Sequence, residues 1–132
     1  MIEFNDKEIK FLNELEEARI ATSHDNMPHV KPVSFVFVDN SIVIATDYNT
    51  RTYNNIKINS KTGIVIDIYK SGGHKAICIQ GDTEIIEAGS DFKKMYNIFH
   101  KKFAWVRKDP WKENEAPFLK IIPKNKTSWG LS

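Results

Sequence analysis

A nearly unbroken run of hydrophobic residues from Val33 to Val38 is the strongest pattern in the chain. A strand with so little alternation between apolar and polar positions is expected to be covered on both faces. The strand should begin near Pro28, and it ends at Asp39-Asn40, a pair that is typical of a two-residue hairpin turn. Ser41 to Thr46 is a second apolar run, so the two segments predict a central hairpin.

Weaker apolar patterns predict the remaining strands. Arg19 to His24 alternates like a strand and is followed by a turn at Asp25-Asn26. Gln80-Gly81 interrupts a long apolar segment, where a glycine often marks a β-bulge or a close backbone approach. Further strands are expected over Thr62 to Tyr69, Lys75 to Glu87 and Phe118 to Ile122, and residues 126–131 are expected to form a short tail.

Polar caps and helical spacing predict helices at three places. Asn5 and Glu8 have the spacing of a capping box at the start of the first helix. A short helix is expected from Arg51 to Asn59, and Ser90-Asp91 is expected to cap a third. Trp105 to Pro117 has no regular period and is expected to be irregular. The third helix carries an apolar stripe that we assign to the core: Phe92, Met95, Tyr96, Phe99 and Phe103.

Strands dominate this order of elements, and tight turns join most of them. The pattern predicts a mainly β (β+α) protein, an antiparallel barrel with peripheral helices, in which closure removes exposed strand edges. A chain of 132 residues is long enough for one hydrophobic core. We therefore expect a single domain over residues 1–132.

The amino-acid composition of the chain serves mainly to exclude classes of function. The formal charge of +2 is small and the lysines are scattered, so no nucleic-acid or membrane partner is expected. The N-terminus has no export signal and no apolar run could span a bilayer, which predicts a soluble, cytoplasmic protein. The single cysteine, Cys78, is expected to be an inert buried thiol. The histidines lack metal-ligand spacing, so no metal site is expected.

Functional chemistry is expected where the second strand of the hairpin ends. Residues 47–52, Asp-Tyr-Asn-Thr-Arg-Thr, place hydroxyls and a guanidinium at the start of a helix, whose free amides attract anions. Arg51 is unfavourable in a first helical turn unless an anion is present, which favours a phosphate there. Thr46 and Thr50 could instead simply end the strand and cap the helix. Lys31, on the neighbouring strand, could equally well reach into water.

Two motifs resemble one known family. Residues 28–36, Pro-His-Val-Lys-Pro-Val-Ser-Phe-Val, resemble a family strand that begins Pro-x-x-Arg and lies along a flavin. Residues 45–52, Ala-Thr-Asp-Tyr-Asn-Thr-Arg-Thr, resemble the segment Tyr-Thr-Asn-x-x-Ser-Arg-Lys, with the same spacing from threonine to arginine. With the order of elements, they resemble the flavin-binding split-barrel family typified by pyridoxamine 5′-phosphate oxidase. The resemblance implies an antiparallel split β-barrel and a homodimer with FMN at the subunit interface.

The resemblance also implies roles for individual residues. Thr46 would hydrogen-bond the flavin or its ribityl chain. Thr50 and Arg51 would hold the phosphate, and Lys31 would add charge from the neighbouring strand. Backbone groups of the strand residues would meet the edge of the ring. The cofactor-binding residues implied in this way are Lys31, Pro32, Val33, Ser34, Ala45, Thr46, Thr50, Arg51, Thr52, Lys57 and Trp129.

Three departures from the family pattern bear on the substrate. Thr52 stands where the family has a lysine, and Lys57, one turn further on, could replace that charge. Ala76 stands where the oxidase has a glutamine near the ring. The C-terminal Arg-x-His element with which the oxidase grips pyridoxamine has no counterpart. The resemblance therefore supports the cofactor site better than a vitamin B6 substrate.

These observations predict a flavin (FMN)-dependent oxidoreductase that transfers a hydride between the flavin ring and an unknown small molecule. The flavin performs that chemistry, so no catalytic side chain is assigned. Trp129 and the segment from Trp105 to Trp111 are expected near the site, stacked on a ring or at the dimer interface. Two alternatives remain: a reductase on the same fold that uses the deazaflavin coenzyme, and a non-catalytic protein that binds flavin or haem.

Overall fold

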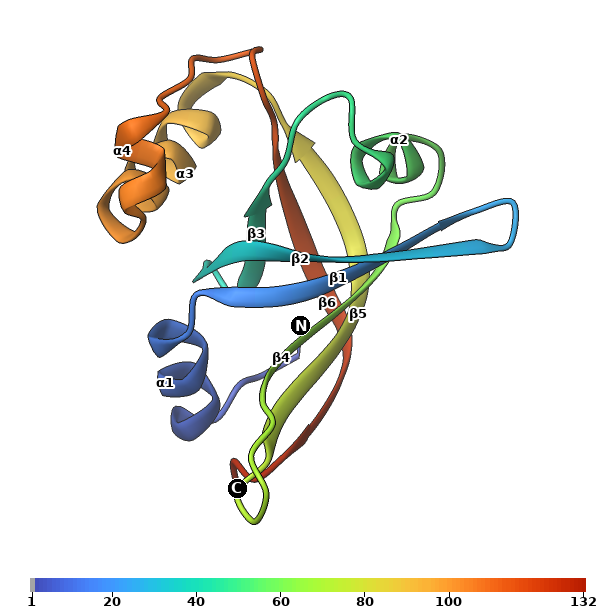
Figure 1. The fold of residues 1–132 in the computed structure, drawn as a ribbon, viewed down its shortest axis with the longest axis vertical. Coiled ribbons are helices and arrows are strands. Elements are labelled where there is room, and N and C mark those ends of the chain that lie inside the picture. Colours follow the sequence, from blue (N-terminus) through green and yellow to red (C-terminus); the bar gives the residue numbers. More distant parts are fainter. Residues whose placement is uncertain (1) are drawn as a thin grey trace.

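Six antiparallel strands close into a barrel in the computed structural model, which describes residues 2–132 (Figure 1). Around the barrel their order is β1-β2-β3-β6-β5-β4, and β4 pairs again with β1. The strands are β1 (Glu17–His24), β2 (Met27–Val38), β3 (Ser41–Ala45), β4 (Lys61–Ile68), β5 (Lys75–Ile86) and β6 (Phe118–Trp129). The helices are α1 (Asp6–Glu14), α2 (Arg51–Ile58), α3 (Gly89–Lys102) and α4 (Ala104–Lys108). The predicted mainly β barrel with peripheral helices is confirmed.

Two tight turns set the pairing of the first three strands. The φ angles are 50° at Asp25 and 62° at Asn26, and 53° at Asp39 and 58° at Asn40. Positive φ at both central residues is what a type I′ turn requires, and Asp and Asn tolerate it better than most residues. Both predicted hairpins are therefore confirmed, and their turns fix the register of β1 with β2 and of β2 with β3.

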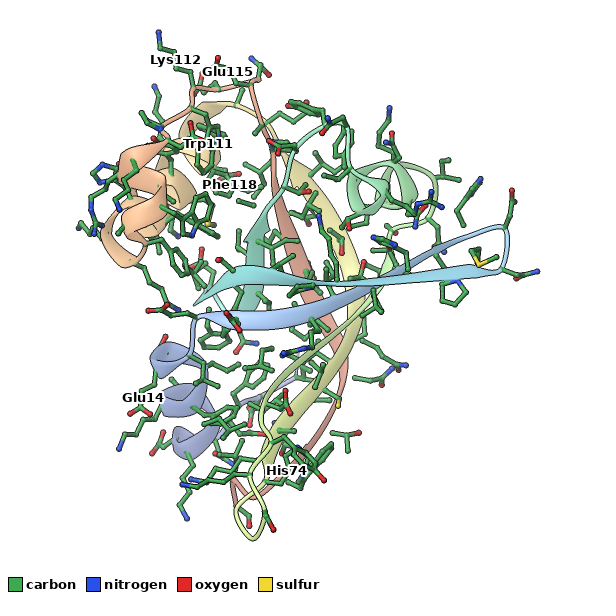
Figure 2. The ribbon with its side chains drawn as sticks, viewed as in Figure 1. Glu14, His74, Trp111, Lys112, Glu115 and Phe118 are labelled. Carbon is green, nitrogen blue, oxygen red and sulfur yellow. The ribbon has the colours of Figure 1, made fainter. Side chains whose placement is uncertain are left out.

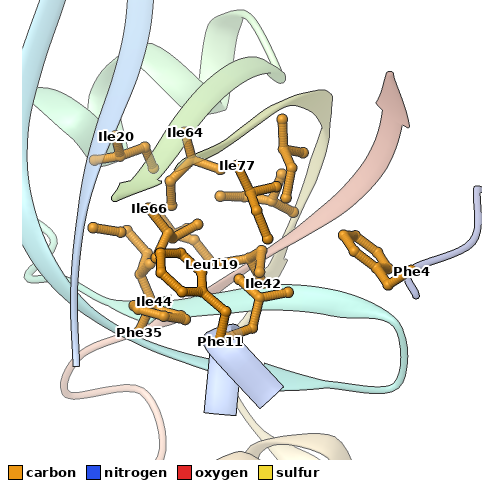
Figure 3. Packing of buried hydrophobic residues seen from close by; sticks show 14 of the residues in the cluster. Phe4, Phe11, Ile20, Phe35, Ile42, Ile44, Ile64, Ile66, Ile77 and Leu119 are labelled. Carbon is orange, nitrogen blue, oxygen red and sulfur yellow. The ribbon is translucent and has the colours of Figure 1, made fainter. Parts of the chain in front are cut away.

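The barrel interior is filled by aliphatic side chains together with Phe35 (Figure 3). Phe11 of α1 belongs to the same cluster, as do Tyr53 and Ile56 of α2. The barrel residues of this cluster include Ile20, Ile42, Ile44, Ile64, Ile66, Ile77 and Leu119. The inward side chains of all six strands thus share one core with residues from two helices.

A second hydrophobic cluster covers the outer face of β2, β3 and β6, beneath α3 and α4. Val36 and Val43 face each other across β2 and β3, and both are buried in this cluster. The expected apolar stripe of α3 packs against them, with Phe92, Met95, Phe99 and Phe103 buried and Tyr96 at the margin. Because Phe35 points into the barrel and Val36 points under α3, β2 is covered on both faces, as its unbroken apolar run predicts.

β6 differs from the sequence prediction, because it continues through residue 129 and does not end at Ile122. Pro123 lies within it, opposite Gly81, at a register shift between β5 and β6. A bulge tolerates a proline because the amide that proline lacks is not needed in the ladder there. The bulge predicted at Gln80-Gly81 is confirmed, and it is also what allows the strand to continue.

Three smaller predictions are also wrong. α4 lies inside the segment expected to be irregular. α3 begins at Gly89, and its N-cap, Ala88, makes no side-chain hydrogen bond, so the expected Ser90-Asp91 cap lies inside the helix. Cys78 is half-buried rather than buried, because the inward positions of β5 beside it are taken by Ile77 and Ile79.

The capping box at the start of α1 is confirmed and joins the two ends of the chain. The Asn5 side chain accepts a hydrogen bond from the Glu8 amide at 2.8 Å, and the Glu8 carboxylate accepts one from the Asn5 amide at 2.9 Å. The same carboxylate is buried and accepts a hydrogen bond from Lys126 Nζ, on β6, at 2.8 Å. Burial opposes ionisation, but the hydrogen bonds from Lys126, Asn5 and Ser128 outweigh it and lower the pKa of Glu8.

This lowered pKa predicts a loss of stability in acid. Glu8 contributes stability above its unfolded pKa, about 4.3, and that contribution is lost as pH falls towards the lower folded pKa. We expect Glu8→Gln to lower the free energy of unfolding at pH 7 and to flatten its decline below about pH 5. Urea denaturation at several pH values measures both effects. Glu14→Gln, at an exposed position of α1, is the control. A decline in Glu8→Gln as steep as in the parent protein would contradict the prediction.

Candidate functional site

Thr50 caps α2 and forms part of a chain of hydroxyl hydrogen bonds. Its Oγ1 accepts a hydrogen bond from the Tyr53 amide at 3.2 Å and donates one to the Asp47 carbonyl at 2.9 Å. Thr46 Oγ1 lies 2.9 Å from Thr50 Oγ1 and is the donor, because the Thr50 proton points to Asp47. Lys31 Nζ donates to Thr46 Oγ1 at 3.4 Å. Lys31, Thr46 and Thr50 form what we call the polar corner, between β2, β3 and the start of α2.

The pairing of the strands positions the polar corner. Thr46 follows the last residue of β3, and its amide donates to the Pro117 carbonyl at 3.3 Å. Lys31 lies on the part of β2 that extends beyond β3, so its side chain reaches Thr46 across the end of the hairpin. Burial lowers the pKa of Lys31, and the Asp47 carboxylate acts in the opposite direction. A half-buried ammonium beside neutral hydroxyls favours the binding of an anion.

The first turn of α2 adds charge and free amides to this corner. Arg51 is exposed and makes no ion pair with any residue in the range 2–132. The backbone amides of Arg51 and Thr52 belong to the first turn of α2, where the N–H groups have no hydrogen-bond partner within the helix. The Thr52 side chain is fully buried, and its Oγ1 has no hydrogen-bond partner among the residues described. The polar corner and this first turn therefore combine cations, hydroxyls and backbone donors.

The other strand residues predicted for the site lie beside an open backbone edge. Pro32, Val33 and Ser34 pair with β1 on one side. On the other side they have no paired strand within residues 2–132, because β3 begins its pairing opposite Phe35. Ala45 ends β3 at this point. Backbone groups on the open edge are therefore available to a ligand that lies along β2.

Two of the predicted residues lie away from the polar corner. Lys57 is in the last turn of α2, with its Nζ 5.5 Å from the centre of the Tyr53 ring. Trp129 ends β6 at the other end of the barrel, where its Nε1 donates to His74 Nδ1 at 3.2 Å. Figure 2 shows His74 at the end opposite Trp111. One chain therefore does not bring Trp129 to its own polar corner.

A pocket of about 320 Å³ adjoins the polar corner. We call it the tryptophan pocket, and its lining residues are Ala45, Thr46, Asp47, Trp105, Asp109, Trp111, Glu115 and Ala116. The sequence indicated that Trp105 and Trp111 lie near the site, and the pocket places them beside Thr46. It did not single out Asp109 or Glu115, because carboxylates in an irregular polar segment carry no periodic signal.

Residues 2–132 contain no cluster of three or more His, Cys, Asp or Glu side chains that could hold a metal ion. None of the helices in the same range combines the length and the apolar character that crossing a membrane requires.

The closed antiparallel barrel, its covering helices and the polar corner define a protein of the split-barrel class. Residues 4–127 match the family model of pyridoxamine 5′-phosphate oxidase. The chain therefore belongs to that family, and the resemblance drawn from the two sequence motifs is confirmed. A search of the curated proteins found no match.

Solved structures with a similar fold differ in what they bind. One is a candidate pyridoxamine 5′-phosphate oxidase from Listeria innocua (TM-score 0.77, 17% identity, 95% of this chain and 97% of that chain). A second is an FAD-binding protein from Mesorhizobium loti (TM-score 0.75, 16% identity, 95% and 94%). A third is the haem storage protein of Vibrio cholerae (TM-score 0.79, 13% identity, 89% of each chain). At these identities the similarity shows the fold alone.

Proposed function

We propose that this protein is an FMN-dependent oxidoreductase that transfers a hydride between the flavin ring and a small molecule. The observation that carries the proposal is the polar corner, where Lys31 and two threonine hydroxyls meet the first turn of α2 and the exposed Arg51. Membership of the oxidase family supports it, as does the FAD-binding neighbour from Mesorhizobium loti.

The polar corner fits the phosphate of FMN. A phosphate needs several N–H or O–H donors and compensating positive charge, and a helix N-terminus offers both. Here Lys31 and Arg51 would supply the cations, Thr46 and Thr50 would supply hydroxyls, and the first turn of α2 would add its free amides. The unpaired hydroxyl of the buried Thr52 is one more polar group in this turn.

The remaining residues would bind and orient the ring. When bound, the flavin supplies the hydride chemistry. The open edge of Pro32–Ser34 would present backbone groups to the polar edge of the ring, and backbone N–H groups there would stabilise negative charge. Ala45 and Thr46 would hold the part of the cofactor between ring and phosphate. No side chain of this chain is required as a covalent nucleophile.

We extend the proposal to a homodimer with the cofactor at the interface. Trp129 is 42% exposed and lies far from its own polar corner, so it would reach a cofactor only in the partner subunit. The β1–β2 hairpin that projects from the barrel also exposes Met27 and Val30 (Figure 1). Analytical ultracentrifugation with FMN tests this arrangement, and a monomer that binds FMN at full affinity would contradict it.

Arg51→Glu provides the test of the phosphate site. Reversing this charge should weaken FMN binding by about 2 kcal/mol, or about 30-fold in Kd, because a charge-assisted hydrogen bond is lost and a repulsion is added. Titration of the protein with FMN, followed by flavin fluorescence, measures the change. Lys93→Glu makes the same change of charge at an exposed position of α3 and should leave Kd within about twofold. Unchanged affinity in Arg51→Glu would place the phosphate elsewhere.

Direct titration distinguishes FMN from two other candidate ligands, the deazaflavin coenzyme and haem. The deazaflavin coenzyme also carries phosphate, so the same corner could hold it, and competition with FMN decides between the two. Haem is considered because structural neighbours from Vibrio cholerae and Mycobacterium smegmatis are a haem storage and a haem-binding protein. Absorbance spectra with each ligand distinguish a haem-binding protein from a flavoprotein. Bound flavin that no reductant can turn over would favour a non-catalytic role.

A further inference from the structure

The tryptophan pocket combines an aromatic wall with an excess of negative charge. We propose that it binds a small organic cation, of the quaternary or substituted ammonium class. The binding stands on the pocket itself and does not rest on the proposed flavin function.

The aromatic wall is made by two indoles held in a fixed arrangement. The rings of Trp105 and Trp111 are stacked, with centroids 5.9 Å apart and planes 6° from parallel. The Trp111 amide donates to the Tyr96 hydroxyl at 3.3 Å, and the Trp111 ring meets the Tyr96 ring edge-on at 5.0 Å. Phe118 supports the Trp111 ring, with centroids 5.6 Å apart. Because indole is the best aromatic partner for a cation, a wall already in place lowers the cost of binding one.

The charged groups of the pocket are all acidic. Asp47, Asp109 and Glu115 line it, and no lysine or arginine is among its lining residues in the described part of the chain. Glu115 Oε1 accepts a hydrogen bond from the Lys112 amide at 2.7 Å, which holds this carboxylate in place. Lys31 partly compensates Asp47, so Asp109 and Glu115 carry most of the excess negative charge. Concave surfaces lined by one sign of charge concentrate the opposite ion.

The same charges argue against the flavin as the occupant. A phosphate would be repelled by three carboxylates, and so would the negative charge of a reduced flavin ring. The polar corner and the open edge of β2 carry the complementary charge and donors instead. Ala45 and Thr46 belong both to the predicted cofactor site and to the pocket wall. A cation in the pocket would therefore lie next to the flavin.

Choline and its uncharged carbon analogue, 3,3-dimethylbutan-1-ol, test the proposal because they share a shape and differ in charge. Titration of the flavin-free protein is followed by the indole N–H signals in two-dimensional nuclear magnetic resonance spectra. We expect choline to shift the signals of Trp105 and Trp111 and to leave that of Trp129 unchanged. We expect the neutral analogue to bind at least about tenfold more weakly. Equal binding of the two compounds, no binding of choline, or an equal shift at Trp129 would overturn the proposal.

Matched variants locate the binding. Trp105→Leu should weaken choline binding at least about tenfold, whereas Trp129→Leu should not, although both indoles are 42% exposed. Asp109→Asn should weaken it about threefold or more, and Asp91→Asn, an exposed aspartate of α3, should have no effect. Loss of binding in the control variants would overturn the proposal, as would displacement of choline by FMN. Failure of FMN to bind would instead refute the proposed function and leave the choline result standing.

Discussion

Phe118→Ala should lower the free energy of unfolding by about 4 kcal/mol, the largest effect expected of any single substitution considered for this protein. Phe118 is fully buried at the start of β6. Its ring lies 5.2 Å from that of Phe92 and 4.9 Å from that of Phe99, measured between centroids. Removing the ring loses its transfer free energy and leaves a cavity among aromatic neighbours that cannot easily collapse.

Urea denaturation followed by circular dichroism measures this loss, and Phe118→Leu is the matched control. Leucine keeps part of the buried volume, so we expect less than half of the destabilisation. Trp111 packs against Phe118, so its fluorescence should also change in the folded alanine variant. A loss below about 1.5 kcal/mol would show that the cluster beneath α3 closes over the missing ring.

Gly81→Ala should cost about 3 kcal/mol, because the added methyl group has no room. A Cβ at this position would overlap the Ile122 carbonyl oxygen and lie 2.9 Å from the Ile122 carbonyl carbon. Both atoms belong to the backbone of β6, so no side-chain rotation can relieve the overlap. The two strands would have to separate at the bulge, in the middle of the most extensive pairing of the barrel.

Gly63→Ala is the control for this prediction. Gly63 lies on β4, next to β5, and a Cβ there would meet only the Ala21 Cβ at 3.8 Å and the Ile79 carbonyl oxygen at 4.0 Å. Those are ordinary contacts, so the change should stay within about 0.5 kcal/mol of zero or stabilise slightly, since a glycine inside a strand is itself unfavourable. Thermal and urea unfolding of both variants would show the difference. If the two substitutions changed the free energy of unfolding equally, the close approach of β6 to Gly81 would not be the cause of the destabilisation.

The features predicted correctly from sequence are those that neighbouring residues determine among themselves. Asn5 and Glu8 satisfy each other's backbone groups within one turn of α1. Asp39 and Asn40 adopt the positive φ of their turn because of their own side chains and backbone. Thr50 caps α2 from the adjoining position, as the alternative to a phosphate-binding role describes. Local interactions of this kind leave a signal in a few consecutive residues, which pattern analysis can detect.

The failures arose where a residue's conformation depends on a distant partner. Pro123 suggests the end of a strand, yet β6 continues because its register with β5 shifts by one residue there, opposite Gln80-Gly81. α4 is a single short helix whose Val106 is buried within the second hydrophobic cluster. In such short segments tertiary packing overrides weak intrinsic propensity.

By itself, the sequence determined most of the strands, their hairpins and the cap of α1, since alternation, turn chemistry and capping act over a few residues. It also carried the motif that identifies the family. Only the tertiary structure placed Lys31 against Thr46, moved Trp129 to the opposite end of the barrel, and brought Asp109 and Glu115 beside Asp47. Asp109 and Glu115 are far from Asp47 in the chain, and they come beside it because β3 pairs with β6 when the barrel closes. Closure is a property of all the strands together, so no single stretch of sequence records it.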